Sequence, residues 1–244
     1  MRRRTLLSLL TAVMIAAVAG IALSLTSHAS TPPVLPSNPA FESSKATAVW
    51  TTTDGFRLNN NEWNPAAGPQ TIWGNSYENW GVQSDQAAGN KLVETYPCIQ
   101  AFYSNVPVLS YKAIQNGFTE SMPDTTGVDA ELADDVWMNN HAIEMMIWVD
   151  NHGQYPAGKI IAQATIDGQP FNLWLGGKVY TFALVGNETT GVTDILASIK
   201  WLMQKGYVPA TATLGQVDFG WEIASTDGSP MNFTMTDYWL HAYL

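Results

Sequence analysis

The feature that most constrains this chain is a series of short segments rich in Thr, Val, Tyr and Trp. Between Trp50 and Ser110 they are separated by turn-like stretches such as TTDGF, NPAAGP, WGNS and SNVP. Branched and aromatic residues favour strands, while Gly, Pro and Asn favour turns. Further on, the stretch from Glu131 to Gly153 predicts a hairpin with a tight turn at Asn140-His141. Asp167-Gly168 is a strong two-residue turn signal between strands.

One segment, TTGVTDILASIKWLMQKGYV, breaks the strand pattern and predicts a helix. Its apolar residues recur at helical spacing, Thr190 or Thr193 can cap its start, and Lys205-Gly206 suits its end. Many short strands with a single helix predict an all-β fold, a jelly-roll sandwich of two antiparallel sheets.

The N-terminus has the pattern of an export signal. Three arginines, Arg2 to Arg4, precede an uncharged stretch from Thr5 to Leu25, and Ser27 to Ala29 supply small residues two apart. We predict a signal peptide over residues 1–29, cleaved after Ala29, and a secreted, extracellular protein. The apolar stretch exceeds the usual ~7–15 residues, so an uncleaved membrane anchor stays open as an alternative. The arginines also admit twin-arginine export.

The rest of the chain predicts one domain after a leader. Residues 30–48 are rich in Ser, Thr and Pro and predict a flexible leader or linker. Residues 49–244 suffice for one domain with a sizeable core. Cys98 is the only cysteine, so no intrachain disulfide can form.

Charge and histidine spacing exclude several classes of function. Eleven basic residues, three of them at the N-terminus, face 21 acidic ones, which argues against nucleic acid or an anionic membrane surface as partner. The four histidines, His28, His141, His152 and His241, show no metal-ligand spacing, and no cysteine cluster exists. We therefore predict no metal and no cofactor.

The stretch HAIEMMIWVD places Glu144 among apolar residues. Side chains of a strand alternate between its faces. Ile143, Met145, Ile147 and Val149 then form one apolar row, whereas the opposite row holds Glu144, Met146, Trp148 and Asp150. This mixed row is typical of a wet cleft.

The stretch GQVDFGWEIAST repeats this design with Glu222. Val217, Phe219, Trp221 and Ile223 form an apolar row, and the opposite row holds Asp218, Gly220, Glu222 and Ala224. We expect the small Gly220 and Ala224 to leave room for a ligand beside Glu222.

Two glutamates from separate strands that face one cleft are what glycoside hydrolysis requires. One donates a proton to the leaving oxygen, and the other attacks the anomeric carbon or activates water. Three alternatives stay open. Each glutamate could lie on a solvated outer face. The chain could be a non-catalytic polysaccharide-binding β-sandwich, which would also explain its 10 tryptophans. The long apolar start could belong to a membrane-tethered structural protein.

Four motifs in order resemble one family. AIEMMIW and FGWEIASTDG resemble the nucleophile and acid/base strands of family 12 glycoside hydrolases, the secreted endo-β-1,4-glucanases and xyloglucanases. NNNEWNP and YPCI resemble two upstream segments of that family, and the likeness extends from about Trp50 to Leu244. It implies a long open cleft on the concave sheet and a retaining endo-β-1,4-glucanase. A xyloglucan-specific enzyme of the same fold is the alternative.

The resemblance assigns catalytic roles by position. Glu144 corresponds to the nucleophile, Glu222 to the acid/base and Asp135 to an aspartate that assists the nucleophile. A two-residue turn at Asn140-His141 would pair Asp135 with Met146, diagonal to Glu144. The competing Asp134 would point to the opposite face.

The resemblance also implies substrate-binding residues and a partner. Trp63 is expected to stack on a glucose ring and Asn61, or its neighbour Asn60, to bind a hydroxyl group. The remaining candidates are Met146, Trp148, Pro156, Gly158 and Asn187. The expected partner is a β-glucan (cellulose, mixed-linkage glucan or xyloglucan), with no nucleic acid, no membrane after signal cleavage, and a monomeric enzyme. The loop between Asp135 and Glu144 is shorter than is usual in the family, and the disulfide of some members is impossible here.

Overall fold

The computed structural model describes residues 34–244, which belong to one compact unit. The predicted signal peptide and its cleavage site after Ala29 lie outside the described residues and stay predictions. Within the described part of the chain, no helix is long and apolar enough to span a membrane.

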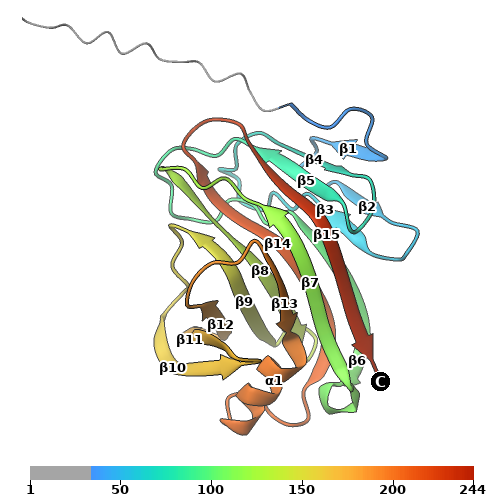
Figure 1. The fold of residues 1–244 in the computed structure, drawn as a ribbon, viewed down its shortest axis with the longest axis vertical. Coiled ribbons are helices and arrows are strands. Elements are labelled where there is room, and N and C mark those ends of the chain that lie inside the picture. Colours follow the sequence, from blue (N-terminus) through green and yellow to red (C-terminus); the bar gives the residue numbers. More distant parts are fainter. Residues whose placement is uncertain (1–33) are drawn as a thin grey trace, which may run out of the picture. The chain divides into compact units, whose positions relative to one another are not determined.

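Two large β-sheets make up the fold, and one helix accompanies them (Figure 1). The six-stranded sheet has the order β1 (Phe41–Ser43), β4 (Gln70–Gly74), β5 (Trp80–Ser84), β15 (Met231–Tyr243), β7 (Ala113–Ser121) and β13 (Thr190–Asp194). The nine-stranded sheet has the order β10 (Lys159–Ile166), β11 (Gln169–Gly176), β12 (Val179–Leu184), β9 (Ile143–His152), β8 (Val128–Met138), β14 (Thr213–Thr226), β6 (Cys98–Pro107), β3 (Arg57–Asn59) and β2 (Val49–Thr51). The predicted all-β jelly-roll sandwich is confirmed.

One strand pair departs from the predicted antiparallel pattern. β12 runs parallel to β9, with Val179 opposite Glu144 and Thr181 opposite Met146. The antiparallel β10–β11–β12 meander returns the chain to the free edge of β9 in this direction. As a result, β12 extends the face that carries Glu144.

The core lies between the two sheets and is rich in aromatic side chains. Phe118 of β7 packs on Phe219 of β14 at 5.3 Å between ring centroids, and Trp80 of β5 packs on Trp221 at 4.8 Å. Trp80, Phe219 and Trp221 are fully buried. Burial of large rings contributes several kcal/mol of hydrophobic stabilisation. It also orients β14 so that its alternate residues face away from the core.

The β8–β9 hairpin has the predicted register but a wider turn. Asp135 pairs with Met146 and Trp137 with Glu144, as predicted. Four residues instead of two connect the strands, because Asn139, Asn140 and His141 all adopt positive φ angles. A two-residue hairpin turn of type I′ needs only two such residues. Asp167-Gly168 does form a two-residue turn, with φ of 47° and 84°.

The helix α1 (Ile195–Gln204) lies where the sequence predicts it, but its N-cap differs. The cap is Asp194, whose side chain accepts a hydrogen bond from the backbone N–H of Ala197 at 2.8 Å. Thr190 and Thr193, the predicted caps, belong to β13 instead. Asp194 is both the last residue of β13 and the N-cap of the helix. No loop separates the strand from the helix, so both threonines lie within the strand. A short 3₁₀ helix, η1 (Val108–Ser110), follows β6.

Part of the predicted leader belongs to the fold. Phe41 to Ser43 form β1, which pairs with β4, although the sequence places the domain boundary at residue 49. The Phe41 ring stacks on Trp50 at 5.6 Å with an interplanar angle of 10°. The segment around Phe41 has the composition of a linker, but its stacking on Trp50 and its pairing with β4 hold it in the fold.

The Asp194 cap can be tested by unfolding. Asp194→Ala should lower the free energy of unfolding by about 1 kcal/mol, because the Ala197 N–H loses its acceptor. Asp194→Asn is the matched control, since its amide oxygen can still accept from the Ala197 N–H, while its NH2 group can donate to a Gln115 amide that has turned its oxygen inward. Urea unfolding followed by tryptophan fluorescence measures both variants. Equal stability of the alanine variant and the wild type would contradict the cap.

Candidate active site

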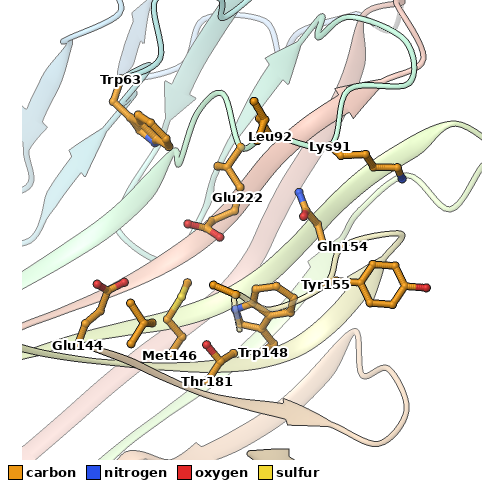
Figure 2. Close-up of a pocket in the computed structure, with 13 residues that line it drawn as sticks. Trp63, Lys91, Leu92, Glu144, Met146, Trp148, Gln154, Tyr155, Thr181 and Glu222 are labelled. Carbon is orange, nitrogen blue, oxygen red and sulfur yellow. The ribbon is translucent and has the colours of Figure 1, made fainter. Parts of the chain in front are cut away.

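A pocket of about 370 Å³ opens on the face of the nine-stranded sheet that points away from the core (Figure 2). Its floor comes from β9 and β12, and one side comes from β14. The lining residues are Trp63, Lys91, Leu92, Val93, Glu144, Met146, Trp148, Gln154, Tyr155, Ala157, Val179, Thr181 and Glu222. A cavity of this size falls within the range of small-molecule sites in proteins.

The alternation of side chains along β9 supplies the pocket floor. Met145 and Ile147 are fully buried in the core, whereas Glu144, Met146 and Trp148 line the pocket. Met146 and Trp148 form a small separate apolar cluster with Ala133 of β8. The buried Trp148 Nε1 has no hydrogen-bond partner among the described residues.

Asp150 does not continue this row, contrary to the sequence-based prediction. Trp148 pairs with Ala133 and Asp150 pairs with Leu132, so Val149 is an extra residue on β9 and forms a β-bulge. A bulge reverses the alternation beyond it. Asp150 therefore lies beside Glu120 of β7, between the sheets. Burial and then the Asp150 charge raise the pKa of Glu120 to about 8, although a hydrogen bond from Trp221 opposes this shift.

The alternation along β14 brings Glu222 into the same pocket. Val217, Phe219, Trp221 and Ile223 all belong to the core, as predicted. Glu222 points the other way and is partly exposed. Figure 2 shows the Glu222 carboxyl turned from one side, and the Glu144 carboxyl from the other, toward a shared space.

Gly220 has a different role from the predicted one. A Cβ atom at this position would lie 2.1 Å from the carbonyl oxygen of Pro97 and 2.7 Å from Cys98 Cα. The glycine therefore allows the neighbouring strand to approach, and it leaves no room for a ligand. Ala224, the other small residue of this row, is fully buried.

Burial governs the electrostatics of Glu144. Desolvation, and after it the negative charge of Glu222, raise the pKa of Glu144 to about 7. The two carboxyl groups thus interact, although 78 residues of sequence separate them.

Asp135 lies where the predicted register places it. It is 7% exposed, and burial raises its pKa well above the ordinary value; the charges of Glu144, Asp218 and Glu222 add to the effect. Asp134 points to the opposite face, as expected, where it accepts a hydrogen bond from Asn116 of β7. Only Asp135 of this pair can therefore act on Glu144.

Asp218 is a further acid of this face, directly opposite Asp135 across β8 and β14. It accepts hydrogen bonds from Gln100 at 3.1 Å and from Gln216 at 2.8 and 2.7 Å. Burial raises the pKa of Asp218 to about 7, while these amides and the Arg57 charge lower it. Sequence reasoning placed Asp218 on the Glu222 face but gave it no role.

Glu131 is a site residue that the sequence analysis missed. It lies directly opposite Glu222 across β8 and β14 and is completely buried. The alternation of ELADDVW, with Glu131 four residues before Asp135, was the available signal. That signal did not reveal which residue of β14 would lie opposite.

Exposed apolar side chains surround the pocket. Trp63 is 57% exposed, Leu92 71% and Tyr155 81%. Figure 2 shows Trp63 and Tyr155 at opposite ends of the pocket. Exposed apolar side chains gathered around a pocket are typical of ligand-binding surfaces. Trp63 was predicted, whereas Leu92 and Tyr155 were not.

Four predicted substrate-binding residues do not line the pocket. The amide of Asn61 donates to the carbonyl oxygen of Tyr96 at 3.1 Å and so holds a loop; the alternative, Asn60, is fully buried. The exposed Asn187 bonds to the backbone of Asn151 at 3.3 and 3.1 Å.

The other two, Pro156 and Gly158, lie in the QYPAG loop, where their neighbours face the pocket instead. Pro156 is buried. Gly158 has a φ of 86°, and a Cβ there would lie 1.9 Å from the carbonyl oxygen of Leu175. Gln154, Tyr155 and Ala157 of this loop line the pocket. The remaining lining residues that were missed are Lys91, Leu92, Val93, Val179 and Thr181. Within residues 34–244, no group of three or more His, Cys, Asp or Glu side chains is placed to hold a metal ion.

Comparison with known proteins identifies the family. The sequence model of glycosyl hydrolase family 12 matches residues 54–241. Endoglucanase A of Aspergillus kawachii (strain NBRC 4308) is 26% identical over 208 residues, which cover 75% of this chain and 85% of that protein.

Solved structures show the same fold. The xyloglucanase domain of NopAA, a type three effector from Sinorhizobium fredii in complex with cellobiose, has a TM-score of 0.77 and 24% identity; the match covers 84% of this chain and 100% of that one. The family 12 xyloglucanase from Bacillus licheniformis has a TM-score of 0.72 and 20% identity, over 83% of this chain and 100% of that one. The family match covers most of the chain and includes both glutamate strands. This chain therefore belongs to glycosyl hydrolase family 12.

Proposed function

We propose that this protein is a retaining endo-β-1,4-glucanase that hydrolyses internal bonds of β-glucans by double displacement. The observation that carries this proposal is the pair Glu144 and Glu222. They come from different strands, line one pocket and interact electrostatically. A protein that only binds polysaccharide has no need for two such carboxyl groups.

In the first step, the Glu222 carboxyl gives its proton to the glycosidic oxygen while the Glu144 carboxylate attacks the anomeric carbon. The bond to the leaving glucan breaks, and a glycosyl ester forms on Glu144. In the second step, the Glu222 carboxylate takes a proton from water, and the resulting hydroxyl group attacks the anomeric carbon. Glu144 leaves as a carboxylate, and the configuration is retained.

Asp135 supports this role of Glu144. Burial raises its pKa and so favours its protonated form, although a hydrogen bond with Trp137 opposes this shift, and its buried Oδ1 has no hydrogen-bond partner within the described residues. A protonated Asp135 can donate a hydrogen bond to the Glu144 carboxylate, which stabilises the ionised nucleophile.

Substrate is expected to lie across the pocket floor, with a glucose ring stacked on Trp63. Met146 and Trp148 line the floor beneath that substrate. A xyloglucan chain remains the alternative substrate, favoured by the two xyloglucanases among the structural relatives. We further propose that the protein acts outside the cell, which rests on its predicted export signal, and that it works as a monomer.

Replacing either catalytic carboxyl group should abolish most of the activity. We expect Glu222→Gln to lower kcat on barley β-glucan by about two to four orders of magnitude, the usual contribution of a general acid. Glu144→Gln should lower it at least as far. Asp167→Asn is the control, because it removes an exposed charge from a turn that Asn-Gly also suits.

Reducing-sugar release from carboxymethylcellulose, barley β-glucan and xyloglucan measures these rates and ranks the substrates. Proton NMR of the first products tests the mechanism, since retention releases the β-anomer first. Intact polysaccharide after incubation with the wild type would favour a binding protein, and an initial α-anomer would exclude double displacement.

The pH dependence should report the ionisation of Glu144. The nucleophile must be ionised, so kcat/KM should fall as the pH falls through about 7. Glu222→Gln removes the second cause of the raised pKa of Glu144, so the acidic limb should move to lower pH. The substrate is an aryl β-cellobioside with an activated leaving group, which departs without protonation. The acidic limb of kcat/KM can therefore be measured even in Glu222→Gln. An acidic limb that is unmoved in Glu222→Gln would contradict the coupling, and Asp167→Asn controls for net charge.

Trp63 should contribute to substrate binding. We expect Trp63→Ala to raise KM on cello-oligosaccharides by up to about tenfold, since aromatic stacking contributes about 0.5–1.5 kcal/mol beyond buried area. Tyr243→Ala is a matched control, because Tyr243 is 55% exposed, similar to Trp63 at 57%, but lies on β15 of the other sheet. Equal KM values for the two variants would exclude the stacking role.

A further inference from the structure

Glu131 occupies a position that the proposed double displacement leaves unused. It is the direct cross-strand partner of Glu222, and side chains of such partners lie about 4.5–5.5 Å apart at Cβ. Glu131 is fully buried, whereas Glu222 is partly exposed at the pocket. Glu131 and Glu222 thus form a cross-strand pair in which Glu131 is buried and Glu222 reaches the pocket.

The surroundings of Glu131 provide almost no hydrogen-bond donor. No hydrogen bond that meets standard distance and angle limits reaches either of its carboxyl oxygens within residues 34–244. The hydrogen-bonding groups that influence its ionisation are the Glu222 carboxyl group and its own backbone N–H. On β9, the opposite residue is Asn151, whose amide donates to the carbonyl oxygen of Gln154 at 3.0 Å. The Tyr96 hydroxyl donates to the carbonyl oxygen of Ala133, two residues along β8, at 3.1 Å. These two groups donate to backbone carbonyl oxygens, and neither donates to Glu131.

The charges near Glu131 are also unfavourable for an anion. Glu222 and Asp129 are both acidic, and the Lys91 ammonium pairs with Asp129. Burial, then the charge of Glu222 and a hydrogen bond with it, and then the charge of Asp129 raise the pKa of Glu131 well above its ordinary value. Only its own backbone N–H opposes this. A buried carboxylate without donors is costly, so Glu131 keeps its proton.

A protonated Glu131 has one hydrogen to donate, and Glu222 is the acceptor that faces it. We propose that Glu131 is a positioning residue that donates this hydrogen bond to Glu222 and holds the carboxylate formed when Glu222 protonates the leaving group. The proton of Glu131 stays on Glu131 throughout. The proton that Glu222 gives to the leaving oxygen is replaced from water. This inference rests on the proposed role of Glu222 as the acid/base.

Two substitutions separate this role from a purely structural one. Glu131→Gln keeps a donor of the same shape that can never ionise, so it imitates a protonated Glu131. Glu131→Leu keeps a similar volume but removes the donor. If the hydrogen bond is what matters, the Gln variant should behave as the wild type and the Leu variant should not.

The first measurement is the pH profile of kcat/KM on an aryl β-cellobioside with a poor leaving group, which requires the acid. We expect Glu131→Leu to lower kcat about tenfold and to move the alkaline limb about one unit to higher pH, because the Glu222 carboxylate loses a donor. Glu131→Gln should keep the wild-type limb. A Leu profile that superimposes on the wild type, or a Gln profile that shifts as far as the Leu profile, would overturn the proposal.

The second measurement needs no activity. The infrared difference spectrum of wild type minus Glu131→Gln at neutral pH should show one carboxylic-acid C=O band, which moves to higher frequency in Glu222→Ala, where the acceptor is absent. If this band is absent, the proposal is overturned even when the protein is an active hydrolase. Conversely, a band with an inactive wild type would refute the proposed function alone. Circular dichroism shows whether each variant folds. If Glu131→Leu does not fold, the infrared spectra still test the proposal, because they need only the wild type, Glu131→Gln and Glu222→Ala.

Discussion

The cost of burying carboxyl groups on one face of a sheet governs the site of this protein. Glu131, Asp135, Glu144 and Asp218 all have raised pKa values, and burial is the largest cause for each. The structure meets this cost in two ways. Asp218 receives hydrogen bonds from two amides, whereas burial shifts Glu131 and Asp135 toward their protonated forms. Ionised and neutral acids can therefore coexist within one cleft.

That arrangement depends on a rigid sheet behind it. The apolar row of β14 is buried against the six-stranded sheet, where Trp221 packs on Trp80 and donates to Glu120 of β7 at 3.1 Å. Trp221 directly precedes Glu222. Packing on one face of the strand thus fixes the direction of the proposed acid/base carboxyl on the other, so stability and catalysis share one strand.

The glutamates of the pocket come from strands, whereas part of its rim comes from loops. Leu92 and Tyr155 are exposed at the pocket and come from loops. Loops tolerate variation that a sheet does not, because they carry few of the ladder hydrogen bonds. Differences in preferred glucan among relatives with this fold are therefore expected to reside in such residues, while the glutamates remain on strands.

The sequence by itself determined the features that local periodicity sets. Alternation placed Glu144 and Glu222 opposite their apolar neighbours, the hairpin register set Asp135 beside Met146, and the helix obeyed its apolar spacing. These features depend on backbone geometry within one or two adjacent segments. Asp194 could have been recognised as the cap in the same way, since Asp is a preferred N-cap residue.

Tertiary structure decided the features that depend on which strands become neighbours. The pairing of Glu131 with Glu222 joins strands far apart in the sequence, and the bulge at Val149 that redirects Asp150 has no local signature. Gly220 accommodates the neighbouring backbone of Pro97 and Cys98, which period-two alternation alone does not predict. Local sequence sets the alternation of side chains along an uninterrupted strand, but sheet order and close packing determine where a bulge breaks that alternation and what lies opposite each residue.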